Sequence, residues 1–171
     1  MRPPLLSFRI PRSLEHDGLR LRPLRIIDIP LVRSGLLRED VIRTTGLGKP
    51  ISYFTVWWWL KKTYTLLYCI EVESKCIGFI GLYNLDGEYA EVTLVIFDSR
   101  DRRLGYGFRA YTAFTTNLCP SSFIKKFIVE VKADNYPSIS FWKKLGFEEL
   151  SAGNGIQTMT KDMERAVRSG Y

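Results

Sequence analysis

The period of the apolar and polar positions changes several times along the chain. Residues 18–24 (GLRLRPL) alternate with the period of two that is typical of a strand, whereas helical spacing starts near Asp28 and recurs over 53–62 (YFTVWWWLKK). Three segments rich in β-branched and aromatic residues follow, separated by short turn signals. They predict an antiparallel meander and cover residues 64–73, 76–85 and 89–97.

The second half of the chain alternates between helical and strand-like segments. Helices are predicted over 108–119 and over 135–147, where Asn135 is the expected N-cap, with a strand over 125–133 between them. Residues 38–52 are predicted to form a loop, or a short helix followed by a turn. With two closing strands, 147–150 and 156–163, the order is β-α-α-β-β-β-α-β-α-β-β, which predicts a mixed sheet covered by helices.

Length and composition favour one globular domain. The chain has 171 residues, of which 46% are hydrophobic, enough for a single well-buried core. No stretch approaches the ~20 apolar residues that span a bilayer. Prolines and arginines interrupt the apolar patches of residues 1–18, so we expect no signal peptide, a cytoplasmic location and no membrane partner.

The cysteine and histidine content excludes several kinds of active site. There are three cysteines, one of them Cys119, without metal-ligand spacing, and His16 is the single histidine. A zinc site, a Cys-His pair or a serine triad each needs ligands or a base that this chain lacks. Cys69 and Cys76 flank a predicted hairpin turn, but their offset is not expected to place them opposite each other. We therefore expect no metal.

The net charge of +7 favours a polyanionic partner but does not identify it. Nucleic acid, a membrane surface and a phosphorylated cofactor would all satisfy it. The basic residues are interrupted by acidic ones, and neither a basic tail nor an aromatic ladder is present, so nucleic acid is the less favoured partner.

Residues 99–110 (SRDRRLGYGFRA) contain two overlapping phosphate-binding patterns that share Gly105 and Gly107. Read from Arg102, the pattern is R-x-x-G-x-G, which indicates an acyl-coenzyme A; read from Gly105, it is G-x-G-x-x-A, which indicates a dinucleotide. A dinucleotide loop lies in the first strand-to-helix turn, with an acid ~20 residues later that Glu130 would roughly supply. Three predicted strands precede this loop and charged residues separate it from the last of them, which favours the acyl-coenzyme A.

The loop and a second segment resemble the GNAT superfamily of N-acetyltransferases. Residues 95–107 (VIFDSRDRRLGYG) resemble the signature strand and loop of that family, and residues 135–147 (NYPSISFWKKLGF) resemble its second signature. The resemblance covers about 19–161, as one domain over 1–171 with terminal extensions 1–18 and 162–171. It implies an α+β fold with a mixed, mostly antiparallel sheet of six to seven strands and about four flanking helices.

The resemblance also implies which residues bind the cofactor, acetyl-CoA. A glycine turn that opens a helix presents free N–H groups and a positive dipole to a diphosphate, and Gly105 and Gly107 let the backbone approach it. The strand before the loop is expected to splay from its neighbour and to bind the pantetheine arm through its backbone. The implied cofactor-binding residues are Val95, Phe97, Arg102, Arg103, Leu104, Gly105, Tyr106, Gly107, Asn135 and Ser138.

The implied reaction is direct attack of an amine on the thioester, with Glu91 as the candidate general base. Strand alternation places Glu91 on the same face as Thr93 and Val95. A solvent-facing strand glutamate remains the alternative. Many members of the family have a tyrosine as general acid at the position of Trp142, which is expected instead to pack in the core or against the cofactor.

The acceptor is predicted to contact the first two helices with their loop and the final hairpin, residues 28–62 and 150–161. Trp57, Trp58 and the tryptophan that follows them fan over ~200° of a helix, so at least one should leave the core; Trp57 and Trp58 are the candidate substrate-binding residues. The chain looks most like ribosomal-protein alanine N-acetyltransferases, which implies a peptide α-amine as acceptor. A small-molecule amine, or a non-catalytic acyl-CoA-binding module, remains open, as does a monomer or a homodimer.

Overall fold

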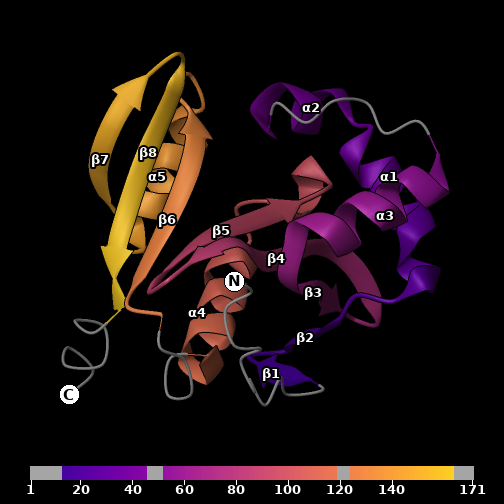
Figure 1. Cartoon of the computed structure of the whole chain (residues 1–171). Helices are drawn as coiled ribbons and strands as arrows, with labels where there is room; N and C mark the ends of the chain where they lie inside the picture. Colours follow the sequence, from indigo (N-terminus) through magenta and orange to yellow (C-terminus); the bar gives the residue numbers. More distant parts are fainter. Residues whose placement is uncertain (1–12, 46–51, 119–123, 164–171) are drawn as a thin grey trace.

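The computed structural model describes residues 13–45, 52–118 and 124–163, and over these residues it forms one eight-stranded mixed sheet with helices on both faces (Figure 1). The strand order is β1-β2-β3-β4-β5-β6-β8-β7, and β5–β6 is the parallel pair among otherwise antiparallel neighbours. The strands are β1 (Leu14–His16), β2 (Leu19–Pro23), β3 (Tyr64–Val72), β4 (Lys75–Asp86), β5 (Tyr89–Ile96), β6 (Lys126–Lys132), β7 (Glu148–Gly153) and β8 (Ile156–Asp162). The helices are α1 (Ile29–Leu36), α2 (Glu39–Thr45), α3 (Tyr53–Thr63), α4 (Tyr106–Leu118) and α5 (Tyr136–Lys144), with short 3-10 turns η1 (Ile26–Asp28) and η2 (Ser99–Asp101).

The predicted class is confirmed, with one strand and one helix more than expected in the described part of the chain. The additional strand, β1, lies in the predicted N-terminal extension and pairs with β2 across a two-residue turn in which Asp17 and Gly18 both have positive φ. The additional helix, α2, lies within residues 38–52, for which the sequence predicted either a loop or a short helix followed by a turn. Parts of the predictions fall outside the described residues, namely 1–12, 46–51, Cys119 and 164–171.

The predicted helix starts at Asp28 and Asn135 are present, and a further N-cap lies at Ser52. Asp28 precedes α1, whose first turn contains Pro30. The side chain of Ser52 accepts a hydrogen bond from the Thr55 N–H at the start of α3, and Asn135 accepts one from the Ser138 N–H at the start of α5. The caps at Ser52 and Asn135 each satisfy an N–H that has no partner within its helix, whereas Asp28 makes no side-chain cap bond to α1.

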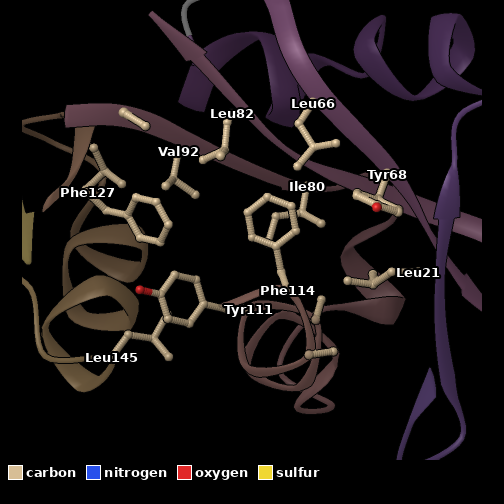
Figure 2. Close-up of a cluster of buried hydrophobic side chains, with 14 of the residues drawn as sticks. Leu21, Leu66, Tyr68, Ile80, Leu82, Val92, Tyr111, Phe114, Phe127 and Leu145 are labelled. Carbon is tan, nitrogen blue, oxygen red and sulfur yellow. The ribbon is translucent and has the colours of Figure 1, made fainter. Parts of the chain in front are cut away.

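Two apolar clusters cover the two faces of the sheet. The larger cluster lies between the sheet and helices α4 and α5, where Tyr111 and Phe114 of α4 lie beneath Ile80 and Val92 of the strands (Figure 2). The smaller cluster lies between the opposite face and helices α1 to α3, and it is centred on Phe79. Side chains of β5 alternate between the two faces of the sheet, so Val92 packs in the larger cluster and Val95 in the smaller one.

Strands β5 and β6 pair over a short distance and then diverge. Their parallel pairing covers Tyr89–Glu91 on β5 and Lys126–Ile128 on β6. Beyond Glu91 the two strands separate, as Figure 1 shows, and α4 begins after the far end of β5. The edge of β5 that faces β6 is therefore unpaired over residues 92–96, and we call this divergence of the two strands the opening. The predicted splay of this strand is present.

Cys69 and Cys76 form a disulfide that was not predicted from the sequence, although they are not directly opposite, as expected from their offset. They are not directly opposite, because Cys69 pairs with Phe79 and Cys76 pairs with Glu71. The register shifts between these pairs, and Ile77 is the extra residue on β4. A bulge of one residue reverses which face the following side chains take, so both cysteines face the smaller cluster.

Candidate functional site

The segment between β5 and α4 presents unpaired backbone amides at the start of a 13-residue helix. Arg103 and Gly105 have positive φ values of 62° and 81°, which turn the chain sharply into α4. The Arg109 N–H donates to the Gly105 carbonyl at 3.0 Å. The N–H groups of residues 106–108 precede that bond and have no helical carbonyl to bind. Together with the helix dipole, they make this end of α4 attractive to an anion.

Glycine is favoured at positions 105 and 107 for different physical reasons. A Cβ at Gly105 would meet only the tip of the Arg109 side chain, at 4.0 Å, so the positive φ is what favours glycine. Gly107 has ordinary helical geometry, but a Cβ there would lie 3.3 Å from Phe141 of α5. The first glycine shapes the turn, and the second allows α4 to pack closely against α5.

Arg102 points back along β5. Its Nε donates to the Ile96 carbonyl at 3.0 Å and its Nη2 to the Phe97 carbonyl at 2.9 Å, while Nη1 lies 2.7 Å from the Asp40 carboxylate. The charges nearer the start of α4 come from Arg103, which is exposed, and from Arg109, which sequence reasoning missed. Arg109 lies over the Tyr106 ring at 4.7 Å and donates to the Asp17 carbonyl.

The remaining predicted loop residues differ in exposure. Leu104 is 57% exposed, and the backbone rather than its side chain is what the loop offers a ligand. Tyr106 and Gly107 open α4 and contribute two of the unpaired amides.

The backbone groups available along β5 are one residue out of phase with the prediction. The Phe97 N–H donates to the Ile77 carbonyl of β4, directly opposite in the register. Because an antiparallel pairing alternates, the backbone groups of Val95 also face β4, whereas those of Leu94 and Ile96 face the opening toward β6. The side chains of Val95 and Phe97 are buried in the smaller cluster.

Glu91 lies at the closed end of the opening, where the β5–β6 pairing stops. It pairs across the sheet with Tyr83, whose hydroxyl is hydrogen-bonded to the Glu91 side chain, and Asn84 Nδ2 donates to Glu91 Oε1 at 2.9 Å. Burial raises the pKa of Tyr83 well above its ordinary value, and the hydrogen bond to the Glu91 carboxylate raises it further. Tyr83 therefore stays protonated and donates. Glu91 is a fixed carboxylate on the α1–α3 side of the sheet.

An aromatic row leads from α3 to this carboxylate. Trp59 meets Tyr64 edge to face at 5.8 Å, and Tyr64 meets Tyr83 at 5.6 Å. Burial raises the pKa of Tyr64 to about 12, against a hydrogen bond with Thr93 that lowers it. The row was not predicted from the sequence, because Trp59, Tyr64 and Tyr83 lie on α3, β3 and β4 and meet only in the folded structure. The one indication in the sequence was that three consecutive tryptophans on a helix point in three different directions.

The two tryptophans predicted to bind substrate lie in different surroundings. Trp57 packs against the smaller cluster, with Lys61 Nζ 4.8 Å from the centre of its ring. Trp58 is 60% exposed and stacks on Phe54. The predicted fan is therefore present, and Trp59 is the member that joins the row to Glu91.

The second signature forms a cap and part of the larger core. Asn135 and Ser138 are joined by the N-cap hydrogen bond of α5 at 3.3 Å, and both are partly exposed. Trp142 is 5% exposed and packs edge to face against Tyr111 and Phe147, as expected for a core residue. Its indole is not placed to protonate a leaving group.

None of the described helices is long and apolar enough to cross a membrane. Within the residues that the structure describes, no group of three or more histidine, cysteine or acidic side chains could hold a metal ion.

Comparison with known proteins identifies the family. Residues 18–148 match the family model described as an acetyltransferase (GNAT) domain, so the chain belongs to the GNAT acetyltransferase family. It is 30% identical over 101 residues to the N-acetyltransferase 9-like protein of Caenorhabditis briggsae, covering 54% of this chain and 51% of that protein. The chain thus spans about half the length of this curated relative.

Solved structures of low sequence identity share the fold. A GCN5-related N-acetyltransferase from Brucella melitensis superposes with a TM-score of 0.71 at 16% identity, over 89% of this chain and 79% of that one. The aminoglycoside acetyltransferase AAC(6')-Ib with paromomycin and acetyl-CoA gives 0.77 at 17%, over 91% and 99%. RimL, a ribosomal L7/L12 α-N-protein acetyltransferase in complex with coenzyme A, gives 0.72 at 14%, over 88% and 97%.

Proposed function

We propose that this chain is an acetyl-CoA-dependent N-acetyltransferase whose acceptor is the α-amine of a peptide or protein N-terminus. One observation carries the proposal. The opening between β5 and β6 has the Glu91 carboxylate at its closed end and leads toward the unpaired amides of α4. A base and an anion site thus lie along one exposed strand edge, as transfer from a long phosphorylated cofactor to an amine requires.

The cofactor lies along β5 in this proposal. Its diphosphate accepts hydrogen bonds from the amides of residues 106–108, with Arg103 and Arg109 adding positive charge. The pantetheine arm pairs with backbone groups of Leu94 and Ile96 that face the opening. The backbone pairing with the pantetheine arm is thus proposed for Leu94 and Ile96, each of which precedes one of the predicted residues, Val95 and Phe97. Asn135 reaches the cofactor from α5, a role compatible with its N-cap hydrogen bond.

The chemical step joins the amine to the acetyl group. The amine nitrogen attacks the thioester carbonyl carbon, whose oxygen is stabilised by backbone N–H groups, and the carbon–sulfur bond then breaks. Glu91 accepts the proton that the nitrogen loses, while Tyr83 and Asn84 keep its carboxylate oriented. The thiolate leaves with a pKa of ~8.5 and takes a proton from water, so no tyrosine is required at the position of Trp142.

The protonation of the acceptor favours an α-amine. Neutralising a lysine-like amine at pH 7 costs ~4.6 kcal/mol, whereas a peptide α-amine with a pKa near 7.7 costs ~1 kcal/mol. The acidic residues near the acceptor helices give little support to a polycation, because Glu39 is exposed and the charge of Asp40 is balanced by Arg102.

The test is release of free thiol from acetyl-CoA with a panel of acceptors. The panel contains matched peptides with a free N-terminus, the same peptides with a blocked N-terminus and a free lysine, and an aminoglycoside. We expect turnover with the free N-terminus, and mass spectrometry should place the acetyl group on the α-nitrogen. Acetylation of lysine or aminoglycoside alone would overturn the acceptor class. Saturable acetyl-CoA binding without thiol release would indicate the non-catalytic module.

Glu91→Gln tests the base within the same assay. Because general base catalysis contributes about 10²- to 10⁴-fold, we expect kcat/KM to fall by at least about a hundredfold with acetyl-CoA affinity retained. Glu88→Gln is the matched control, because Glu88 is half exposed and pairs with Lys125 at 2.7 Å on the surface. Equal activity of Glu91→Gln and wild type would contradict the assignment.

A further inference from the structure

Arg102 joins the end of β5 to helix α2. Its guanidinium binds the carbonyls of Ile96 and Phe97 through two nitrogens and faces Asp40 of α2 through the third. The arginine is two-thirds buried, and Asp40 Oδ2 is shielded from solvent. One planar side chain therefore joins the end of β5 to Asp40 of α2, which lies 56 residues before Ile96 in the sequence.

A second ionic link runs in parallel with the first. Arg38, just before α2, lies 3.7 Å from Asp40 and 3.5 Å from Asp98, the residue that caps η2. Asp98 also pairs with Arg100 at 2.9 Å. The charges on α2 and on the segment between β5 and α4 thus form one network. A helix of seven residues does not hold itself together in water, so these contacts matter for the position of α2.

We propose that Arg102 is a positioning residue that couples the cofactor strand to the acceptor side of the site, rather than a ligand of the cofactor diphosphate. The inference rests on the proposed function, because it requires the cofactor to lie along β5. The Ile96 carbonyl faces the opening and accepts a hydrogen bond from Arg102, so the Ile96 N–H is the last backbone group of β5 that the pantetheine arm can use. Cofactor on that edge immobilises Ile96, then Arg102, and through Asp40 it immobilises α2.

The geometry opposes the alternative in which Arg102 binds phosphate. To face the diphosphate, the guanidinium would have to leave two carbonyls and a carboxylate together. Its positive charge is also balanced by Asp40, whereas the neighbouring Arg103 is exposed at the turn. The arginine of the R-x-x-G-x-G pattern therefore binds the carbonyls at the end of the strand that precedes the loop, rather than the phosphate.

Amide hydrogen exchange of residues 39–45, with and without saturating coenzyme A, tests the coupling without an acceptor. In wild type we expect coenzyme A to slow exchange in this segment by at least about threefold. Arg102→Lys keeps the charge but cannot bind both carbonyls and pair with Asp40 at once, and Asp40→Asn removes the ionic partner; both should lose most of this protection. Arg103→Gln is the comparison at the neighbouring arginine, and it should weaken coenzyme A binding while leaving the protection at saturation intact.

Coenzyme A affinity, measured by calorimetry, separates the two roles of Arg102. If Arg102 served as a phosphate ligand, Asp40→Asn would free its charge and tighten coenzyme A binding. The coupling account predicts equal or severalfold weaker binding for Asp40→Asn, so tighter binding would contradict it. Circular dichroism and thermal melts must first show that each variant is folded. If Arg102→Lys does not fold, Asp40→Asn alone provides the test.

The outcomes distinguish this inference from the proposed function. Saturable coenzyme A binding that leaves exchange in residues 39–45 unchanged overturns the coupling alone. Protection that persists in both Arg102→Lys and Asp40→Asn also overturns it. A chain that does not bind coenzyme A at all overturns the coupling together with the proposed function.

Discussion

The two sides of the site are built in opposite ways. On the proposed cofactor side, β5, the loop and the start of α4 follow one another within residues 89–108, so the groups proposed to bind the cofactor are placed by local turns and by helix geometry. On the proposed acceptor side, Glu91, Tyr83, Tyr64 and Trp59 come from β5, β4, β3 and α3 and meet through tertiary packing. A local site is recognisable as a motif, whereas a site assembled from separate elements is not.

The two halves also differ in what stabilises them. The cluster beneath α4 and α5 is apolar and continuous across the sheet (Figure 2). The smaller cluster under α1 to α3 is supplemented by a buried ionic contact, in which Arg22 binds Asp28 through two nitrogens at 2.7 and 2.8 Å and Glu71 through Nε at 2.6 Å. That contact fixes the start of α1 to strands β2 and β3. The predictions below separate the two halves.

Asp28→Asn should have the largest effect on stability, because it leaves Arg22 buried without its full counter-charge. Breaking one member of a buried ion pair costs about 3–5 kcal/mol, which we expect as the loss in free energy of unfolding. Arg20→Gln is the control: Arg20 is more exposed and lies 3.5 Å from Glu71, so its loss should cost under about 1 kcal/mol. Urea titrations measure both, and equal costs would contradict the buried role.

The pH dependence of stability gives a second test of the buried ion pair between Asp28 and Arg22. Burial alone would raise the pKa of Asp28, but hydrogen bonds from Arg22 and from the Arg25 N–H outweigh it and leave the pKa below its ordinary value. Stability from the ionised carboxylate is therefore fully present above the unfolded-state pKa of ~3.9 and is lost as pH falls through the lower folded-state pKa. Below about pH 4, Asp28→Asn should show a shallower loss of stability than wild type.

Gly105→Val should remove cofactor binding while the fold survives. A branched residue does not tolerate the positive φ of this turn, so the loop must rearrange and misplace the amides of α4. Loss of about two charge-assisted hydrogen bonds predicts at least a hundredfold weaker acetyl-CoA binding by calorimetry. Gly155→Val carries matched strain at φ 75° in the β7–β8 turn and should leave binding unchanged. Similar affinity losses in the two variants would argue for a global effect.

Trp59→Ala should act on the acceptor and not on the cofactor. Loss of its edge contact with Tyr64, worth about 0.5–1.5 kcal/mol, loosens the row that leads to Glu91. We expect the KM for the peptide acceptor to rise severalfold and the KM for acetyl-CoA to stay constant. Trp58→Ala, which removes an exposed side chain, should change neither; an equal response to both would remove Trp59 from the acceptor site.

Gly107→Ala should have the smallest effect of the set. Its Cβ would lie 3.3 Å from Phe141 and 3.6 Å from Leu94, tight enough that these side chains must yield slightly. Alanine gains about 1 kcal/mol over glycine in helix propensity, which offsets that cost. Thermal melts should therefore show a change in stability within about 1 kcal/mol, and acetyl-CoA binding should stay within threefold. A loss as large as that of Gly105→Val would mean that this position contacts the cofactor.

Local signals in the sequence predicted most of the fold. The Asn135 cap, the apolar periods and the glycine loop each depend on residues that are close in the chain. Strand β1 was missed although its Asp17–Gly18 turn is a hairpin signal, because three residues are too few to show a period. The disulfide was missed because the bulge at Ile77, which turns Cys76 to the face of Cys69, has no signature in the sequence.

The acceptor side shows where reasoning from sequence reaches its limit. Glu91 was found by strand alternation, but its partners Tyr83 and Asn84 depend on the β4–β5 register. The phase of the hydrogen bonds along β5 depends on that register as well, which is why Leu94 and Ile96, rather than Val95 and Phe97, face the opening. The direction of Arg102 depends on α2, over 50 residues away in the sequence.

A crystal structure of the chain with coenzyme A bound tests the central claim most directly. The account predicts diphosphate oxygens within hydrogen-bonding distance of the amides of residues 106–108, and a pantetheine arm paired with Leu94 and Ile96 in the gap beside β6. Cofactor bound at another surface, or a diphosphate held by side chains with those amides unengaged, would contradict it.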